Sequence, residues 1–267
     1  MARHGSGKGG CANAAARSTP PGISGIYSAV PRYYNELIGI RSSVRVTPDR
    51  NHEREPDMNK RFAAAVLALA WSGAAPAQDG GPAVDAPTLA VGDSWDYTQR
   101  DLLDKNRTTE VKVTVTAISG DVVSVSVMSG DAQPVTSQTD RSWAMSTEID
   151  GEPSTYRYLD FPLTPGKRWQ SAHGWLNRSG DPFEEDMNFT VAGPARVTVP
   201  AGTFDAIRID GHGSWEKLDG RAHAGATLTI WYAPSVKRIV RYDSVRNGFM
   251  KNHPSGYSLE LERYNVQ

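Results

Sequence analysis

The sequence predicts an all-β protein in which roughly ten antiparallel strands form one curved sheet, closed as a barrel or open as a half-barrel. Two observations support this fold class. Hydrophobic and polar residues alternate with a period of two over much of residues 88–267, and short turn sequences separate the alternating runs. The same range shows no convincing amphipathic helix pattern of ten or more residues.

The clearest predicted element is a β-hairpin within residues 111–127. Valines and an alanine at every second position of residues 111–117 alternate with lysine and threonine, and the valines of residues 123–127 alternate with serine. Ser119-Gly120-Asp121 between the two runs is typical of a tight turn. Valine and threonine favour the pleated, half-buried surface of a sheet, so we expect two antiparallel neighbours here.

The same alternation recurs in residues 187–191, 228–232 and 257–261. Glycine, proline and aspartate mark the turns between strands, because these residues tolerate the backbone angles of a chain reversal. Pro165-Gly166 fits a type II turn, in which proline takes the second position and glycine has a positive φ at the third. The predicted turns lie at residues 91–93, 150–151, 164–166, 179–181 and 219–220.

A sheet of this kind must bury at least one face, and the inward-pointing residues of each run form the predicted core. Most of them are apolar side chains at alternate positions, joined by aromatic residues that follow turns. The predicted core comprises Trp95, Tyr97, Val113, Val115, Val125, Val127, Phe161, Leu163, Trp169, Phe189, Val191, Phe204, Ile230, Leu259 and Leu261.

Residues 58–77 have the organisation of a secretory signal peptide. A basic M-N-K-R start precedes a short apolar run at residues 62–71, and Ala75 and Ala77 form an A-x-A exit. Cleavage is expected after Ala77, with delivery to the periplasm or the medium. The alternative interpretation is a buried, alanine-rich helix. No cysteine follows the apolar run to accept a lipid, which argues against a lipoprotein.

The predicted domain organisation follows from this segment. Residues 1–57 mix polar, glycine-rich and proline-containing stretches, so we interpret them as an over-extended gene start or as a disordered extension. Residues 78–87 are rich in glycine, proline, alanine and aspartate, and are expected to be a flexible leader. Residues 88–267 are predicted to form a single antiparallel β domain.

Charge and cysteine content exclude several classes of function. Of the chain's 29 Lys+Arg and 30 Asp+Glu, residues 78–267 hold 19 and 25, which gives that portion a net charge of −6. Such an acidic domain is a poor partner for nucleic acid. The one cysteine, Cys11, precedes the signal peptide, so no disulfide framework is expected. No apolar run reaches the roughly eighteen residues of a membrane-spanning helix.

Four segments carry a recognisable pattern: V-T-V-P-A-G-T-F-D-A-I at residues 197–207, T-I-W-Y-A-P-S-V-K-R-I-V at 229–240, F-P-L-T-P-G-K-R-W at 161–169 and V-G-D-S-W at 91–95. Together they resemble a group of bacterial exported β-rich proteins of unknown function. The resemblance covers most of residues 88–266 and implies strands joined by a P-A-G-T-F turn and a W-Y-A-P corner. It implies no catalytic residue. Many relatives have a glycine-containing turn where this chain has Ser-Val-Lys-Arg at 235–238.

Turn chemistry accounts for the positions of the P-A-G-T-F motif. Pro200 has no N–H and therefore ends strand pairing. Gly202 supplies a positive φ for the reversal, and Phe204 returns to the apolar face. The proline of W-Y-A-P ends a strand in the same way. We therefore expect an architectural role for both motifs, with a binding role as the alternative.

Metal-binding and catalytic patterns are weak in this sequence. The four histidines after residue 77 show no spacing typical of a metal site, although ligands from distant strands stay possible. We interpret them as scattered surface or half-buried residues, and we expect neither a metal nor a cofactor. They are His173, His212, His223 and His253.

Two further groupings bear on catalysis. On an extended strand His212 and Ser214 would point to the same face, which is the weak basis for an envelope hydrolase. Glu184 and Glu185 would point to opposite faces, which does not fit the paired carboxylates of a retaining glycosidase. We interpret the acidic run at residues 184–186 as a solvated strand edge.

Tryptophan is the remaining distinctive feature of the predicted domain. Indole combines a large apolar area with one N–H donor, so such rings either fill a core or line a ligand pocket. Trp95 and Trp169 follow turns and are expected in the core, whereas Trp175 lies in a polar stretch. The candidate ligand-binding residues are Trp143, Trp175, Trp215 and Trp231.

These observations favour a periplasmic or secreted, non-enzymatic protein that binds a lipid or another apolar small molecule, or a protein partner of the cell envelope. A curved sheet with an apolar interior is suited to such a ligand. The first alternative is an envelope hydrolase that uses His212, Ser214 or a carboxylate from another strand. The second is a structural or adhesive module with an exposed apolar patch. Fold class alone does not decide among them.

Overall fold

The computed structural model describes residues 81–149, 152–176, 181–218, 220, 222–247 and 254–267. Extended strands dominate these ranges, as the period-two pattern predicts. The elements are β1 (Ser94–Asp101), β2 (Thr108–Ser119), β3 (Val122–Ser129), β4 (Val135–Thr139), β5 (Met145–Ile149), β6 (Glu152–Tyr156), β7 (Arg168–Leu176), β8 (Pro182–Val199), β9 (Gly202–Lys217), β10 (Ala222–Ala233), the short 3-10 helix η1 (Pro234–Val236), β11 (Arg238–Arg246) and β12 (Ser255–Asn265).

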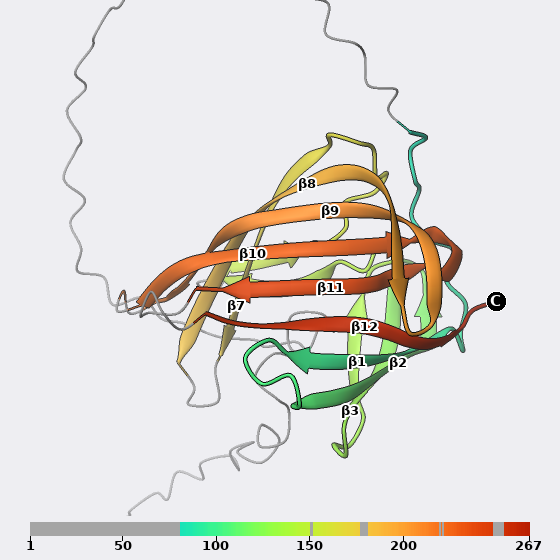
Figure 1. The fold of residues 1–267 in the computed structure, drawn as a ribbon, viewed down its shortest axis with the longest axis horizontal. Coiled ribbons are helices and arrows are strands. Elements are labelled where there is room, and N and C mark those ends of the chain that lie inside the picture. The colour runs from blue at the N-terminus through green and yellow to red at the C-terminus, as the bar shows by residue number, and fades with distance from the viewer. Residues whose placement is uncertain (1–80, 150–151, 177–180, 219, 221, 248–253) are drawn as a thin grey trace, which may run out of the picture.

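Ten of these strands form one antiparallel sheet in the order β4-β3-β2-β1-β12-β11-β10-β9-β8-β7. Successive strands are neighbours within β1 to β4 and within β7 to β12, and β12 returns to pair with β1. The sheet curves strongly, so that β8 to β12 arch over an interior that β1 to β3 bound from the other side (Figure 1). Because β4 and β7 remain as edges, the sheet is an open half-barrel and not the closed barrel that the sequence also allowed.

The hairpin predicted within residues 111–127 is confirmed as β2 and β3. Val113 lies opposite Val127 in the register, and both side chains are buried. Gly120 in the connecting turn has a φ of 56°, a conformation that glycine adopts at little cost.

Two other predicted turns are confirmed by their backbone angles. Gly166 has a φ of 81°, and the N–H of Lys167 donates a hydrogen bond to the carbonyl of Thr164 at 3.0 Å. Gly202 has a φ of 135° at the reversal between β8 and β9. The P-A-G-T-F motif therefore joins two long strands of 18 and 16 residues.

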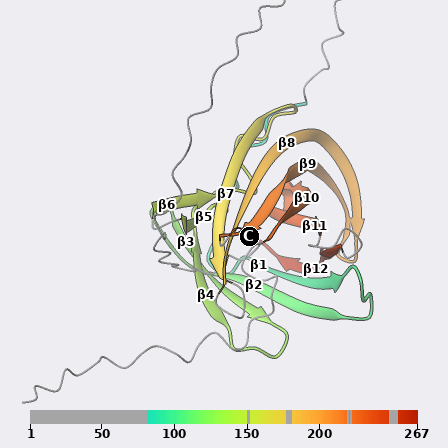
Figure 2. The ribbon, with the colours of Figure 1, turned by 90° about the vertical axis from the view of Figure 1, so that its left-hand side faces the viewer.

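β5 and β6 form a separate two-stranded hairpin. It contacts both edges of the large sheet, β4 and β7, and lies between them (Figure 2). The chain that leaves β6 then runs along the interior, where Tyr158, Leu159 and Leu163 are buried. This hairpin and the segment after it occupy the gap that a closed barrel would have filled with paired strands.

Aromatic side chains from this segment fill the interior of the half-barrel. The rings of Tyr156 and Tyr158 lie 6.4 and 6.3 Å from that of Phe189 on β8, centroid to centroid. Tyr158 also contacts Tyr242 of β11 at 5.6 Å. Each buried aromatic ring contributes a large apolar area, which stabilises the fold by about 25 cal/mol per Å².

The predicted core is confirmed with two exceptions. Every member of the predicted set is buried except Phe161 and Trp169, which pack partly buried against the core. Trp169 lies on the edge strand β7, where its ring stacks on Phe189 at 5.3 Å. β7 has a neighbouring strand of the same sheet on one side only, so the other side of the Trp169 ring is not covered by a strand. This explains the partial exposure of Trp169.

The buried carboxylate of Asp93 joins the beginning of β1 to the turn before β11 and to Gln267, two residues after the end of β12. Its Oδ1 accepts a hydrogen bond from the N–H of Gln267 at 2.9 Å. Its Oδ2 accepts one from the N–H of Ala90 at 2.9 Å and pairs with the ammonium of Lys237 at 3.1 Å. The V-G-D-S-W and W-Y-A-P-S-V-K-R segments therefore meet in space.

The corner at residues 235–238 places Lys237 in a backbone conformation that glycine adopts most readily. Lys237 has a φ of 60°, in the left-handed region. A residue with a Cβ atom adopts this region at a cost of roughly 1–2 kcal/mol. The ammonium of Lys237 offsets that cost through its bonds to Asp93 and to the carbonyl of Gln267 at 2.6 Å, which a glycine could not form.

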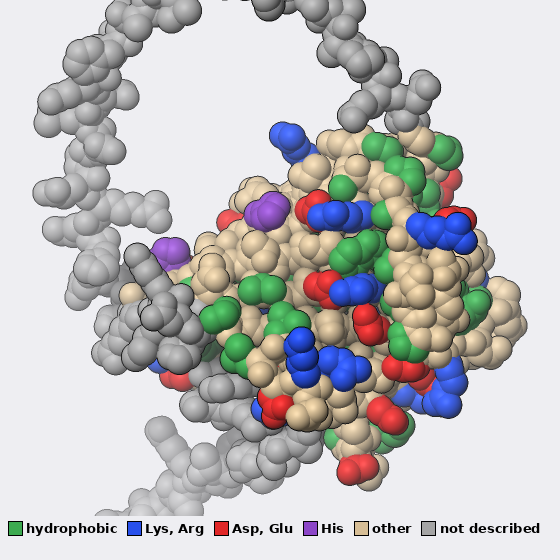
Figure 3. All heavy atoms as spheres, in the orientation of Figure 1, with side chains coloured by type: hydrophobic (Ala, Val, Ile, Leu, Met, Phe, Trp, Pro, Cys, Tyr) green, Lys and Arg blue, Asp and Glu red, His purple; other side chains and the backbone are tan. Residues whose placement is uncertain are grey.

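The outer face of β9 to β12 carries paired charges of opposite sign, as Figure 3 shows. Arg208 pairs with Asp210 at 2.9 Å, and Arg241 pairs with Asp243 at 3.0 Å and with Glu260 at 3.3 Å. Exposed pairs of this kind contribute little to stability. Their effect is to balance the charge on this face.

The predictions for the beginning of the chain lie outside the described residues. They are the segment 1–57, the signal peptide at 58–77 with its cleavage after Ala77, and the first part of the leader. Further along, Val84 forms a β-bridge with Leu163 through two backbone hydrogen bonds of 3.0 and 2.7 Å. Among the described residues, no helix has the length and apolar character needed to cross a bilayer.

Replacing Asp93 by asparagine should lower the free energy of unfolding by about 2–3 kcal/mol, because a buried charge that accepts three bonds is lost. Urea unfolding followed by tryptophan fluorescence measures this. The control is Asp96→Asn, at a partly exposed ion pair, with an expected change within about 1 kcal/mol. Equal effects of the two variants would contradict the role given to Asp93.

Candidate functional site

The candidate tryptophans do not gather at one place. Trp143 is buried in the turn before β5, where its ring contacts Trp95 at a centroid distance of 5.4 Å. Trp231 lies on the outer face of β10, beneath the guanidinium of Arg241 at 5.2 Å. These two rings therefore cannot line the same pocket.

The other two candidates lie on β7 and β9. The ring of Trp215, on β9, contacts that of Phe183 at 5.6 Å. Trp175 lies opposite Phe183 in the register of β7 and β8, and its side chain is outside the described part of the structure. The prediction that these residues bind a ligand stays a prediction.

Trp143 belongs to a cluster that the sequence did not suggest, which we call the arginine corner: Trp95, Tyr97, Trp143 and Arg238. The Arg238 guanidinium lies 4.0 Å from the centre of the Trp143 ring and 5.1 Å from that of Trp95. The Tyr97 hydroxyl donates a hydrogen bond to the carbonyl of Ile239 at 2.9 Å. Burial raises the pKa of Tyr97 to about 12, although the nearby Arg238 opposes the shift, so the phenol stays protonated.

A second buried cluster joins β7, β8 and β11. The Arg246 guanidinium binds the Glu185 carboxylate with both Nη2–Oε1 and Nη2–Oε2 distances of 3.1 Å. The Nε of Arg246 donates to Oε1 at 3.2 Å. Both side chains are nearly inaccessible to solvent, at 9% and 1% exposure. This is a buried, multidentate ion pair, and both carboxylate oxygens are already bound by the guanidinium.

His173 completes this second cluster. Its Nδ1 lies 4.0 Å from Oε2 of Glu185, and its ring lies 4.1 Å from that of Tyr156. Burial lowers the pKa of His173 from 6.5 to about 4; the carboxylate of Glu185 opposes this shift and Arg246 adds to it. The imidazole is therefore neutral at pH 7. With Glu185 held by Arg246, the cluster is suited to fixing three strands.

Two interpretations from the sequence were wrong at this cluster. Glu185 is not on a solvated edge: it is buried, and β8 lies between β7 and β9 in the sheet. His173 is neither a surface nor a half-buried residue, since 3% of it is exposed. The alternation itself contained the signal, because Glu185 has the same parity as the inward-pointing Met187 and Phe189.

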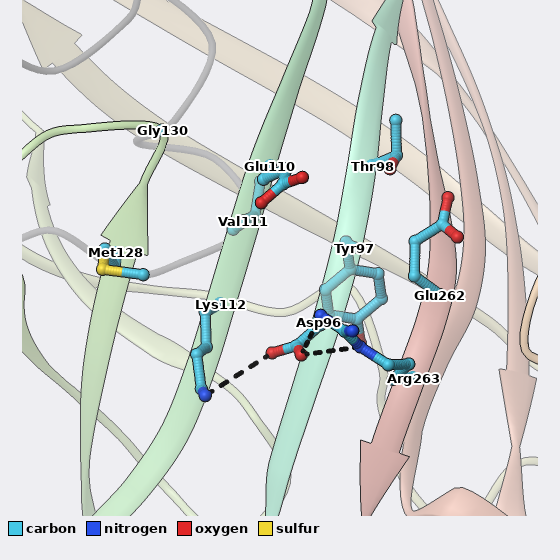
Figure 4. Close-up of a pocket in the computed structure, with 10 residues that line it drawn as sticks. All are labelled: Asp96, Tyr97, Thr98, Glu110, Val111, Lys112, Met128, Gly130, Glu262 and Arg263. Atoms are coloured by element: carbon cyan, nitrogen blue, oxygen red, sulfur yellow. Dashed lines mark hydrogen bonds and ion pairs between the residues drawn. The ribbon is translucent and has the colours of Figure 1, made fainter.

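The outer face of β1, β2, β3 and β12 contains a groove of about 600 Å³. At one end Asp96 pairs with Arg263 at 3.2 Å and with Lys112 at 4.0 Å. Figure 4 shows Glu110 and Glu262 further along, on either side of β1. The residues that line the groove are Asp96, Tyr97, Thr98, Glu110, Val111, Lys112, Met128, Gly130, Glu262 and Arg263.

His212 and Ser214 lie on β9, and both are at least partly accessible. In the register His212 is opposite Thr227 and Ser214 is opposite Gly225 of β10. Their position on the sheet is the one expected from the alternation, away from the groove on β1 to β3. Among the described residues no three histidine, aspartate, glutamate or cysteine side chains are grouped as metal ligands would be.

Removing one partner of the Glu185–Arg246 pair should be strongly destabilising. Glu185→Gln leaves a buried guanidinium without its counter-charge, and we expect the free energy of unfolding to fall by about 3–5 kcal/mol. Chemical denaturation measures this loss. In Arg241→Gln, at the exposed pair, the expected change is within about 1 kcal/mol. A loss from Glu185→Gln no larger than in this control would contradict the burial of the pair.

His173 should make the fold sensitive to mild acid. Its folded-state pKa, about 4, is below its unfolded value of 6.5, so the unfolded chain takes up the proton first. The contribution of His173 to the free energy of unfolding is therefore fully present above pH 6.5. It decreases as the pH falls toward 4, by roughly 3 kcal/mol in total. Unfolding at a series of pH values measures this. His173→Phe should flatten that part of the profile, and an unchanged slope would refute the assignment.

Comparisons with known proteins give a likeness of fold only. No protein-family model and no curated protein matches the chain. A crystal structure of a proposed lipoprotein from Parabacteroides distasonis is 12% identical, covers 69% of this chain and 100% of its own, and gives a TM-score of 0.47. A proposed exported protein with a YmcC-like fold from Bacteroides fragilis is 15% identical, with the same coverage and a TM-score of 0.39. The hypothetical lipoprotein YmcC from Escherichia coli is 8% identical, covers 66% of this chain and 86% of its own, and gives a TM-score of 0.36. At these values the likeness extends to no site and no function.

Proposed function

We propose that this chain is an exported binding protein that recognises a protein partner of the cell envelope through the groove on β1, β2, β3 and β12. The observation that carries this proposal is the groove itself, an open concave surface on the outside of the sheet. Export is supported by the basic start, the apolar run and the A-x-A exit of residues 58–77. Non-covalent binding is the activity that such a surface serves most directly.

The packing of the interior favours this partner over an enclosed lipid. Tyr156, Tyr158 and Leu159 are each at most 4% exposed and occupy the concave side of the sheet. A lipid or other apolar small molecule would need the space that these side chains fill. The groove on the outer face requires no such displacement.

The chemistry of the groove indicates what the partner presents. Asp96 is neutralised by Arg263 and Lys112. Glu262 on β12 carries no ion pair within the described part of the chain, and Glu110 is exposed on β2, on the other side of β1. The side chain of Met128 adds an exposed apolar surface. A partner segment with lysine or arginine beside an apolar residue is therefore complementary in charge and in hydrophobicity.

Peptide binding by the protein recovered from the periplasm tests this function. Fluorescence anisotropy is measured with a labelled peptide that alternates lysine and leucine, and with a matched peptide that alternates glutamate and leucine. We expect saturable binding of the first peptide. The double variant Glu110→Gln with Glu262→Gln should weaken it about tenfold, since two groove charges contribute roughly 1–2 kcal/mol together.

The matched control removes two negative charges from outside the groove, at Asp205 and Glu216, which are exposed on β9. The Asp205→Asn, Glu216→Gln variant should bind within about twofold of the unmodified protein, because its charges are distant from the groove. Equal weakening of both double variants would show that net charge alone attracts the peptide. That result, or equal binding of the glutamate peptide, would reject the proposal.

A further inference from the structure

Arg238 in the arginine corner is buried at the beginning of β11, with 9% of the residue exposed. The planes of the Trp95 and Trp143 rings stand at 85° to each other, and the guanidinium lies against both. Attraction between a cation and an aromatic ring stabilises this arrangement. Contacts between the face of the guanidinium and an aromatic ring do not use the N–H groups at the edge of the guanidinium.

Both indole rings are fixed by the backbone that precedes Arg238. The Nε1 of Trp95 donates to the carbonyl of Val236 at 2.8 Å, and the Nε1 of Trp143 donates to that of Lys237 at 3.0 Å. The rings therefore use their polar groups elsewhere and present carbon surfaces to the guanidinium. The corner is a preorganised cradle for one arginine.

Arg238 differs from the other buried arginine in having no counter-charge. Arg246, which is buried to the same degree, is bound by Glu185. Within the described residues no carboxylate pairs with Arg238, and its Nη1 is buried without a hydrogen-bond partner. Buried charges in proteins are normally paired and hydrogen-bonded. Burial also lowers the pKa of Arg238, although Tyr97, which interacts with the guanidinium, opposes this shift.

Trp143, whose ring lies against one side of this guanidinium, belongs to the turn at residues 140–143. The N–H of Trp143 donates to the carbonyl of Asp140 at 3.1 Å, and the Asp140 carboxylate accepts the N–H groups of Ser142 and Ala144 at 2.7 and 2.8 Å. Trp143 has a φ of 66°, which is unusual for a tryptophan. Strained residues of this kind persist where surrounding contacts enforce them, often at binding sites.

We propose that Arg238 is the anchor of an oxyanion-binding site, in which a carboxylate or phosphate group pairs with the Nη1 edge of the guanidinium while Trp95 and Trp143 hold its faces. The planar guanidinium matches the two-oxygen edge of such anions. Because Nη1 is enclosed, the anion enters when the turn at residues 140–143 shifts, whereas Trp95 stays fixed on β1. Tyr97 belongs to both this corner and the lining of the outer groove, but the proposal does not depend on the function proposed for the groove.

Inorganic phosphate and acetate are the probes, with potassium chloride at equal ionic strength as the reference. We expect phosphate or acetate, at ten times its dissociation constant, to raise the melting temperature of the protein by about 3–5 °C above the chloride reference. Tryptophan fluorescence should change and saturate over the same concentrations, because Trp143 must move. The absence of a saturable response to both anions would overturn the proposal without the need for any variant.

Variants then locate the anion. Arg238→Met should abolish both responses. Arg241→Gln should keep them, since Arg241 also lies over a tryptophan but is paired with Asp243 and Glu260. If Arg238→Met does not fold, Arg238→Lys replaces it: a lysine keeps the buried cation but lacks the planar fork, so the apparent affinity should fall about tenfold. Unchanged affinity in the Arg238 variant would overturn the proposal.

Vesicles distinguish the source of the anion. Co-sedimentation is measured with phosphatidylcholine vesicles that contain or lack phosphatidic acid. Retention by phosphatidic acid that is lost on substitution of Arg238 supports a lipid headgroup as the bound anion. A response to free phosphate or acetate with no vesicle binding supports a soluble oxyanion. Vesicle binding that is identical in the Arg238 variant would count against this site as the anchor.

Discussion

The continuity of the sheet depends on the pairing of β12 with β1, and one buried carboxylate supports this pairing at its end. The large sheet consists of two series of strands, β1 to β4 and β7 to β12, and these are joined edge to edge only where β12 pairs with β1. Asp93 lies at one end of that seam, where it binds the backbone of Ala90 and Gln267 and the ammonium of Lys237. The pairing of β12 with β1 places Trp95 and Tyr97 in the core beside the beginning of β11. Without this pairing the arginine corner could not form.

The two buried arginines show two ways of keeping a cation inside an apolar protein. Arg246 is compensated by a carboxylate, and three strands are joined as a result. Arg238 lies against the faces of two indole rings and interacts with Tyr97, while its Nη1 has no hydrogen-bond partner among the described residues. The first arrangement is complete in itself. The arrangement around Arg238 can accept one further hydrogen-bonding group. We therefore assign a ligand to Arg238 and none to Arg246.

Alternation of residue types predicted the fold class, the hairpin at residues 111–127 and nearly all of the core. This was possible because every second side chain of a strand points to the same face of the sheet, whatever the rest of the chain does. The open edge was not predictable, since it depends on where the hairpin of β5 and β6 settles between β4 and β7. Glu185 and His173 were misplaced because their polarity was given more weight than their parity. The arginine corner unites residues 95, 143 and 238, and no local pattern indicates a contact between segments so far apart.

The return of β12 to β1 also determines when the domain can become complete. Ser94 is paired with Asn265, so the first strand has no partner on that side until nearly the whole domain has been synthesised. Contacts between such distant parts of a chain form slowly, because a long loop must close first. A polypeptide with this topology therefore joins its two series of strands only after β12 has been made.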